Sequence, residues 1–202
     1  MTEIIKITDK RYSKQHVINQ LQEGKIVVYP TDTIYGIGAN IFNLNAVKKV
    51  YNIKQRPFNK PLSITVNNID QLESITKIDT KTKSIVKKLL PGPYTLILKK
   101  TDKIHPLLTS NTNKVGIRMP DNRIALELAE EFPITSTSAN ITGQITGRTI
   151  HEIKKQLKDN VDIYLDMDLI SNKTPSTIID LTGNSPKILR KGEIKHELKN
   201  IL

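Results

Sequence analysis

The stretch Tyr29-Pro-Thr-Asp-Thr-Ile-Tyr-Gly-Ile-Gly38 crowds hydroxyl groups, one carboxylate and two glycines into a few residues directly after an apolar run. That run, Ile26–Tyr29, has the length and the flanking turn residues of a buried strand. Backbone N–H groups and hydroxyls at such a strand end can both point at an anion. The stretch therefore predicts a strand that ends in a ligand-binding turn.

A second stretch, Lys54-Gln-Arg-Pro-Phe-Asn-Lys-Pro-Leu62, places three cations within seven residues and interrupts them with prolines. Lys and Arg side chains neutralise phosphate groups through charge-assisted hydrogen bonds. The two stretches together indicate a site for a phosphorylated ligand. An ordinary strand end followed by a solvated basic loop would produce the same pattern, so both interpretations stay open at this point.

Strand-like and helix-like segments alternate along the rest of the chain, which predicts an α/β fold with a mixed sheet. We expect strands at residues 4–7, 26–29, 62–66, 94–98, 115–119, 134–137, 162–166, 176–181 and 187–190. We expect helices at residues 13–24, 45–51, 79–90, 122–131, 149–158 and 193–202. Residues 101–114 show little periodicity. No linker or repeat divides the chain, so residues 1–202 are expected to form one domain.

Composition narrows the class of protein. The 202 residues include no cysteine, which excludes disulfides and thiolate metal sites and suits a reducing compartment. No apolar run approaches the ~18 residues of a membrane span, and the first residues do not resemble a signal peptide. We therefore expect a cytoplasmic protein with no membrane partner.

The charge balance of 31 Lys and Arg against 20 Asp and Glu gives a net charge of +11, which favours anionic partners such as nucleotides, pyrophosphate or RNA. Much of the excess is lysine on predicted helices, where solvated faces often carry it. Charge alone is therefore weak support for nucleic-acid binding.

The common nucleotide-binding and catalytic motifs are absent. Gly36 and Gly38 begin like a dinucleotide loop, but Ile41 stands where the third glycine belongs. The segment Gly143–Thr149 lacks both the length and the lysine of a P-loop. The four histidines share no metal-ligand spacing and suggest no catalytic triad.

Polar groups recur at the ends of predicted strands. Thr135-Ser-Thr-Ser-Ala-Asn140 gathers four hydroxyls and an amide, Ser176 opens one strand, and Arg190 closes another. Arg118 lies in the apolar strand at 115–119, where a cation needs an anion, either an internal carboxylate or a substrate. This recurrence predicts that the strand ends share one cleft.

Seven motifs occur in a fixed order: P-T-D-T-x-Y-G-x-G at residues 30–38, K-x-R-P-x-x-K-P-L at 54–62, L-P-G-P-Y-T at 90–95, V-G-I-R-M-P at 115–120, T-S-A-N-x-[ST]-G at 137–143, S-T-I-I-D at 176–180 and L-R-K-G at 189–192. In this order they resemble the YrdC/TsaC family of L-threonylcarbamoyladenylate synthases over nearly the whole chain. The resemblance implies a twisted mixed sheet with flanking helices and a deep basic cavity.

The resemblance also implies an activity and its partners. The family forms threonylcarbamoyl-AMP and pyrophosphate from L-threonine, bicarbonate and ATP with Mg²⁺, and a tRNA threonylcarbamoyltransferase complex uses the product. Binding of double-stranded RNA or tRNA fits the charge. A non-catalytic RNA-binding module is the alternative, and the carbamoyl-phosphate-using domain of hydrogenase maturation proteins is a third reading, weakened by the missing zinc-finger cysteines.

Residue roles follow from the same resemblance. It implies that the catalytic pair Lys54 and Arg56 contacts the ATP phosphates. The other residues implied for ATP are Lys60, Asn140, Arg148 and Arg190. The residues implied for threonine are Thr31, Thr33, Arg118, Ser138 and Ser176. The one carboxylate at hand, Asp32, either helps to place Mg²⁺ or caps its own turn; capping is the preferred interpretation, so no side chain is assigned to the metal.

Two departures from the family pattern matter. Thr65 stands where relatives often carry histidine after the P-L strand start. Longer relatives also carry a second domain, and this chain resembles the short, single-domain form. What closes the cavity without that domain is left open by the sequence.

Overall fold

The computed structural model describes residues 2–8, 10, 12–171 and 174–194. Its strands are β1 (Glu3–Lys6), β2 (Val27–Tyr29), β3 (Gly36–Gly38), β4 (Ser63–Thr65), β5 (Thr76–Lys77), β6 (Tyr94–Lys100), β7 (Lys114–Arg118), β8 (Ile134–Ser138), β9 (Ile163–Asp166), β10 (Thr177–Asp180) and β11 (Lys187–Arg190). Its helices are α1 (Lys14–Gln22), α2 (Leu44–Ile53), α3 (Ile69–Ile75), α4 (Thr80–Leu89), α5 (Pro106–Thr109), α6 (Arg123–Leu128), α7 (Ile150–Leu157) and a 3₁₀ turn at Lys158–Asn160.

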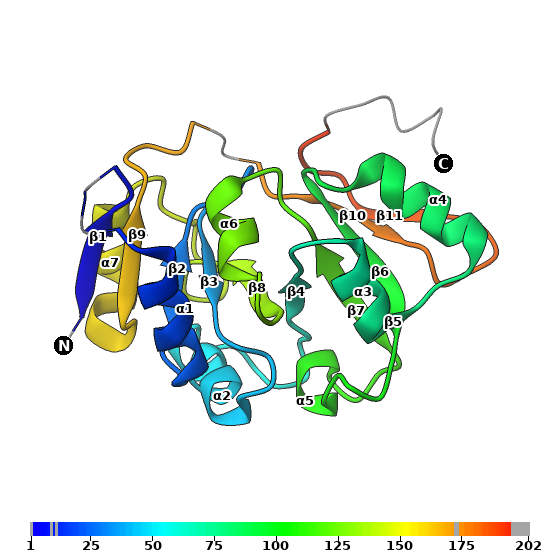
Figure 1. The fold of residues 1–202 in the computed structure, drawn as a ribbon, viewed down its shortest axis with the longest axis horizontal. Coiled ribbons are helices and arrows are strands. Elements are labelled where there is room, and N and C mark those ends of the chain that lie inside the picture. Colours follow the sequence, from blue (N-terminus) through cyan, green and yellow to red (C-terminus); the bar gives the residue numbers. More distant parts are fainter. Residues whose placement is uncertain (1, 9, 11, 172–173, 195–202) are drawn as a thin grey trace.

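The strands join into one mixed sheet in the order β1-β9-β2-β3-β8-β4-β7-β6-β10-β11, with β5 added to β6. Figure 1 shows this sheet running from β1 at one end to β10 and β11 at the other. The sheet contains parallel pairs, such as β4 with β7 and β6 with β10, and antiparallel pairs, such as β3 with β8. The predicted α/β fold with mixed strand directions is confirmed.

Several predicted elements need correction. Gly36–Gly38, expected within a turn, forms β3 and pairs antiparallel with β2. Helix α3 and strand β5 were not predicted, and α5 lies in the stretch of weak periodicity. Of the helix expected at 193–202, Glu193 instead forms a bridge with Ser176, and residues 195–202 lie outside the described part of the chain.

Helix starts follow from local sequence. Helices α1, α2, α3, α4, α6 and α7 each begin after a Ser, Thr, Asn or Asp. The side-chain oxygen of that residue accepts the backbone N–H of the residue three positions later. These N-caps are Ser13, Asn43, Asn68, Asp79, Asn122 and Thr149. Each cap satisfies a backbone N–H of the first helical turn that has no partner within the helix, and this fixes the residue at which the helix begins.

Apolar residues cover both faces of the sheet around β2 and β9, and the core divides into two buried clusters. One cluster joins α1 and α6 to one face of β2 and β9, where Val27 and Ile163 point. The larger cluster includes Val28 and Tyr164 from the opposite face of the same strands, together with α2, α4 and α7. Because strand side chains alternate between faces, neighbouring residues contribute to different clusters.

One face of the sheet's second half is polar instead of apolar. In β7, Val115 and Ile117 point into the core, whereas Gly116 and Arg118 point the other way. A Cβ on Gly116 would lie 2.7 Å from Ser63 Oγ of β4 and 3.2 Å from a methyl of Thr95 in β6. Small and hydroxyl side chains thus line this face and leave room above it.

Replacing Gly38 with alanine is expected to lower the free energy of unfolding by about 1–3 kcal/mol, because a Cβ there has no space. It would lie 2.9 Å from Tyr29 Cε1 and 3.3 Å from Ile134 Cδ1, and Tyr29 is fully buried. Urea denaturation measures the change. Gly183→Ala is the matched control, since its Cβ would meet its first neighbour at 3.8 Å and should change stability little. An unchanged denaturation midpoint for Gly38→Ala would show that the ring moves freely.

Candidate active site

A cavity of about 750 Å³ lies over the polar face of the sheet's second half. Residues from β3, β4, β6, β7, β8, β10 and β11 and from four loops line it. Seven of the residues predicted from the sequence are in this lining: Arg56, Arg118, Ser138, Asn140, Arg148, Ser176 and Arg190. The strand ends therefore do converge on one cleft, as predicted. Ser136, one of the four hydroxyls noted in Thr135–Asn140, also lines the cavity, whereas sequence reasoning missed the hydroxyls of Ser63 and Thr95, which only the strand register brings to this face.

Arginines give the cavity its charge. Arg56, Arg118, Arg148 and Arg190 all line it, and no Asp or Glu does so among the described residues. Burial lowers the pKa of Arg56 and of Arg190, and the nearby charge of Arg118 lowers the pKa of Arg190 further. Cations this close repel one another, so an anion placed among them is stabilised.

Arg118 is held in place by the turn after β2. Its Nη2 donates to Asp32 Oδ1 at 2.9 Å and to Thr33 Oγ1 at 3.0 Å, and the residue is 8% exposed. Its Nε is buried and has no hydrogen-bond partner in the structure. The guanidinium is thus held through Nη2, while its buried Nε is left unsatisfied.

Asp32 does not cap its own turn as the sequence suggested. Its Oδ1 accepts from Arg118, and its Oδ2 accepts the backbone N–H of Asp121 at 3.2 Å. Burial raises the pKa of this carboxyl, and the charge of Arg118 opposes that rise. Thr31 does the turn's internal bonding: its hydroxyl donates to the Ile34 carbonyl at 2.6 Å and accepts the backbone N–H of Thr33 at 3.2 Å.

Lys54 is buried beneath the cavity and does not line it. Its side chain lies at the C-cap of α2, 1% exposed, and donates to three acceptors of the loop after β8. These are the Ser138 carbonyl at 2.5 Å, the Asn140 carbonyl at 2.8 Å and Asn140 Oδ1 at 3.2 Å. All three N–H groups of the ammonium are therefore occupied, which leaves none for the phosphate contact that the family resemblance implied.

The loop that Lys54 holds presents Ser138 and Asn140 to the cavity. Ser138 Oγ donates to Asn140 Oδ1 at 2.5 Å, and Asn140 Nδ2 donates to the Gln144 carbonyl. Because one amide joins the ammonium, a hydroxyl and the next turn, the loop has a defined shape without a ligand. Lys54 and Asn140 thus act as one unit although 86 residues separate them.

Arg56 and Arg148 hold their places through backbone carbonyls. Arg56 Nε donates to the Lys60 carbonyl at 3.1 Å and Nη2 to the Pro61 carbonyl at 2.8 Å. Arg148 Nε donates to the Ile170 carbonyl at 3.1 Å. Lys60 contributes this carbonyl, while its exposed side chain lies outside the cavity lining, which the sequence prediction did not anticipate.

The C-terminal strands close the cavity from the other side. Ser176 Oγ lies 2.7 Å from Thr95 Oγ1, which ties β10 to β6. Arg190 donates through Nη2 to the Ser176 carbonyl at 2.8 Å and to Ser176 Oγ at 3.3 Å. Thr65, at the position where a histidine was expected, is buried away from the lining, and its Oγ1 lies 3.2 Å from the Tyr29 hydroxyl.

The cavity does not fit a magnesium ion held by the protein. Mg²⁺ prefers carboxylate oxygens, and the nearby Asp32 is engaged by Arg118. Among the described residues no group of three or more His, Asp or Glu side chains could hold a metal ion. Arginines and hydroxyls are instead donors suited to anions.

The sequence of this chain is similar to those of known proteins. A model of the Sua5/YciO/YrdC family, described as telomere recombination, matches residues 19–192. A putative threonylcarbamoyl-AMP synthase of Methanocaldococcus jannaschii is 42% identical over 183 residues, 91% of this chain and 85% of that protein. The threonylcarbamoyl-AMP synthase of Pyrococcus abyssi is 37% identical over 180 residues, 88% of this chain but 53% of that protein. The chain thus spans just over half of the latter's length.

Solved structures agree with the sequence comparison. P. abyssi Sua5 complexed with L-threonine has a TM-score of 0.85 at 33% identity and is matched over 95% of this chain and 57% of that one. A Sua5 variant of the same organism reaches 0.90 at 35% identity, over 100% of this chain and 59% of that one. Full-length HypF, at 22% identity and a TM-score of 0.79, shares the fold.

Proposed function

The chain belongs to the Sua5/YciO/YrdC family, and from that premise we propose that it forms threonylcarbamoyl-AMP and pyrophosphate from L-threonine, bicarbonate and ATP. The observation that carries the proposal is the cavity with four arginines, several hydroxyls and, in the part of the chain that the structure describes, no acidic lining residue. Threonine, as its carbamate, carries two negative groups, and ATP carries a triphosphate. A site that must hold both needs an excess of cations.

The reaction has two stages, and neither needs a protein nucleophile. The threonine amine attacks CO₂, in equilibrium with bicarbonate, so a C–N bond forms and a proton leaves the nitrogen. A carbamate oxygen then attacks the α-phosphorus of ATP. An O–P bond forms while the bond to the bridging oxygen breaks, and pyrophosphate leaves with that electron pair. The protein's task is to position two anions and to stabilise the charge on the leaving group.

The cavity residues divide between the two substrates in this proposal. Arg118 pairs with the threonine carboxylate through the Nε that the structure leaves unsatisfied. Ser138 and Ser176 contact the threonyl part, and Thr33 supports it by holding Arg118. The residues for ATP are Arg56, Arg148, Asn140 and Arg190. Lys54 acts as a positioning residue, because it shapes the loop that carries Ser138 and Asn140.

Pyrophosphate release tests the activity. The protein is incubated with ATP and bicarbonate and with each of the twenty amino acids in turn, and pyrophosphate is measured with a coupled enzyme assay. Release that depends on threonine and on bicarbonate is expected. Two results contradict the proposal: pyrophosphate release in the absence of any amino acid, and no pyrophosphate release with any of the twenty amino acids.

An RNA-binding module is the second candidate, favoured by the net charge of +11. It predicts salt-dependent binding of RNA and no threonine-dependent chemistry, so the same assay separates the two functions.

As an enzyme, the protein would supply its product to a tRNA threonylcarbamoyltransferase complex in the cytoplasm. Within the described residues, no helix has the length and apolar character needed to cross a membrane.

Replacing Asp32 with asparagine is expected to raise KM for threonine by about 3–10-fold while kcat changes little, because Arg118 loses the charge that orients it. Steady-state kinetics with threonine as the varied substrate measure the effect. Asp70→Asn, an exposed position on α3, is the control and should leave both constants unchanged. A lower KM in Asp32→Asn would mean instead that Asp32 competes with the substrate for Arg118.

A further inference from the structure

A second cavity, which we call the lysine groove, lies on the opposite face of the same strands. It has a volume of about 700 Å³ and is formed by β5, the start of α4, the end of β6 and the turn that follows β10. Leu98 of β6 points into it, whereas the neighbouring Ile97 points into the active-site cavity. The two cavities share no lining residue, so the lysine groove is not an extension of the candidate active site.

Lysines dominate the rim of the groove. Lys77, Lys81 and Lys99 are exposed, and none forms an ion pair with another described residue. The one acidic lining residue, Asp79, caps α4: its Oδ1 accepts the Thr82 backbone N–H at 2.7 Å. This bond lowers the pKa of Asp79, so its charge persists but is engaged with the helix. The rim therefore keeps an excess of positive charge.

Two of these lysines occupy opposite positions in a pair of neighbouring strands. Lys77 of β5 and Lys99 of β6 are register partners in an antiparallel pair. Like charges in that position destabilise a sheet, and nothing described in the protein compensates them. An anion bound at the rim of the groove would offset the repulsion within this pair.

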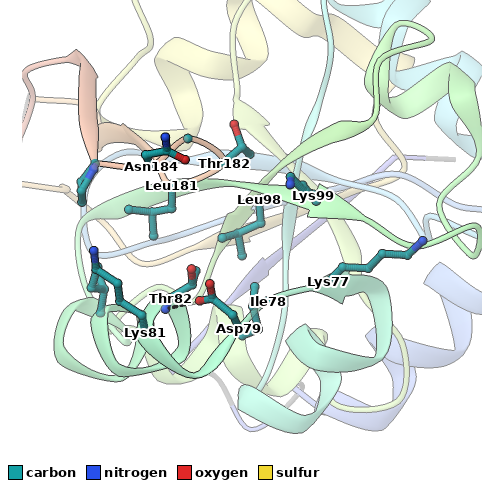
Figure 2. Close-up of a pocket in the computed structure, with 13 residues that line it drawn as sticks. Lys77, Ile78, Asp79, Lys81, Thr82, Leu98, Lys99, Leu181, Thr182 and Asn184 are labelled. Atoms are coloured by element: carbon teal, nitrogen blue, oxygen red, sulfur yellow. Dashed lines mark hydrogen bonds between the residues drawn. The ribbon is translucent and has the colours of Figure 1, made fainter.

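The floor of the groove is aliphatic. Figure 2 shows Leu98 and Leu181 between the start of α4, with Asp79 and Thr82, and the turn with Thr182 and Asn184. Leu98 and Leu181 are themselves buried, whereas Ile78 and Ile85 are partly exposed and form the accessible part of this floor. None of the described lining residues is aromatic, so nucleic-acid bases would find no ring on which to stack. A phosphate backbone would use the lysines but leave the apolar floor uncovered.

The groove continues along α4. An adjoining cavity of about 620 Å³ shares Lys81 and Ile85 with it and adds Lys88 one helical turn beyond. Lysines and aliphatic side chains therefore alternate over a length that suits an extended chain segment more than a single small anion.

We propose that the lysine groove binds an acidic segment of a partner protein, anchored by an aliphatic side chain on the floor at Ile85. Charge complementarity supplies the orientation of such a partner, and the apolar contact adds affinity. Because the groove and the active-site cavity lie back to back, a protein that receives the reactive product could dock here without covering the cavity's lining residues.

The probe is a synthetic eight-residue peptide of alternating glutamate and leucine, titrated into the ¹⁵N-labelled full-length protein. Chemical-shift changes are expected at the groove, and Lys77→Glu/Lys99→Glu should weaken binding by about tenfold or more. The control Lys48→Glu/Lys155→Glu changes net charge equally at exposed positions outside the groove and should bind within about twofold of wild type. Threonine-dependent pyrophosphate release should persist in both, so failure here is distinct from failure of the proposed function.

The single variant Lys77→Glu gives a signature that a merely structural role would not produce. It places an opposite charge across from Lys99, so Tm is expected to rise by about 1–2 °C while peptide binding weakens. Three outcomes overturn the proposal: no shifts at the groove, equal losses in the control pair, or binding of a double-stranded RNA oligonucleotide at the groove where the peptide does not bind. A matched peptide with glutamine for glutamate should not bind.

Discussion

Replacing Lys54 with methionine is expected to lower the free energy of unfolding by about 3 kcal/mol and kcat by at least about tenfold. Methionine fills a similar volume, but the Ser138 and Asn140 carbonyls and Asn140 Oδ1 then lose their buried donor. The loop that presents Ser138 and Asn140 would lose its defined position, so its substrate contacts would weaken as well. Thermal unfolding and pyrophosphate release measure the two effects.

The control for this experiment lies on the same helix. Lys48→Met removes an exposed lysine of α2 and should change neither Tm nor kcat. A Lys54→Met protein with normal Tm and only a higher KM for ATP would contradict the positioning role. It would show instead that the ammonium leaves the loop and contacts the ATP phosphates.

The Lys54 network also predicts a dependence of stability on pH. Burial lowers the pKa of Lys54 to about 7, below its ordinary value of 10.5. Between these values the unfolded chain binds the extra proton, so unfolding takes up a proton and the free energy of unfolding rises with pH. The stability difference between wild type and Lys54→Met is therefore expected to widen from pH 7 to pH 10 in urea titrations. A difference that is constant over this range would refute the lowered pKa.

Replacing Arg118 with alanine is expected to raise KM for threonine by about 10–100-fold, because a charge-assisted bond to the substrate carboxylate is lost. The change also leaves Asp32 as a buried carboxylate without its cation, so Tm should fall. The double variant Arg118→Ala/Asp32→Asn removes that unpaired charge. It should recover part of the Tm while KM stays high, which separates substrate binding from structural support.

Arg123→Ala is the matched control for Arg118. Its side chain is 73% exposed, and its ion pair with Glu127 lies within α6, so little change in stability or kinetics is expected. If Arg118→Ala binds threonine as wild type does, the carboxylate is held elsewhere in the cavity, and the assignment of Arg118 is wrong.

The sequence predicted the fold class and most elements because these depend on local patterns. N-cap residues mark the helix starts, and apolar runs mark the central strands. The sequence did not predict β3, because glycines have low strand propensity. The structure shows why glycines stand there: a Cβ on Gly36 or Gly38 would contact the Tyr29 ring. Helix α3 and strand β5 were missed because both are short.

The sequence also indicated which residues belong to the site, but not what each of them touches. Lys54 and Arg56 look equivalent in the chain, yet one is buried under the Ser138–Asn140 loop and the other lines the cavity. Arg118 was expected to need an anion, and the structure supplies Asp32 while leaving Nε unsatisfied.

By itself, the order of residues determined the alternation of strands and helices, the excess of positive charge and the placement of polar groups at strand ends. Only the tertiary structure decided which of those groups meet, because strand order and register arise from packing between segments far apart in the chain. That is why Lys54 reaches Asn140, why Arg118 reaches Asp32, and why Lys77 of β5 pairs with Lys99 of β6.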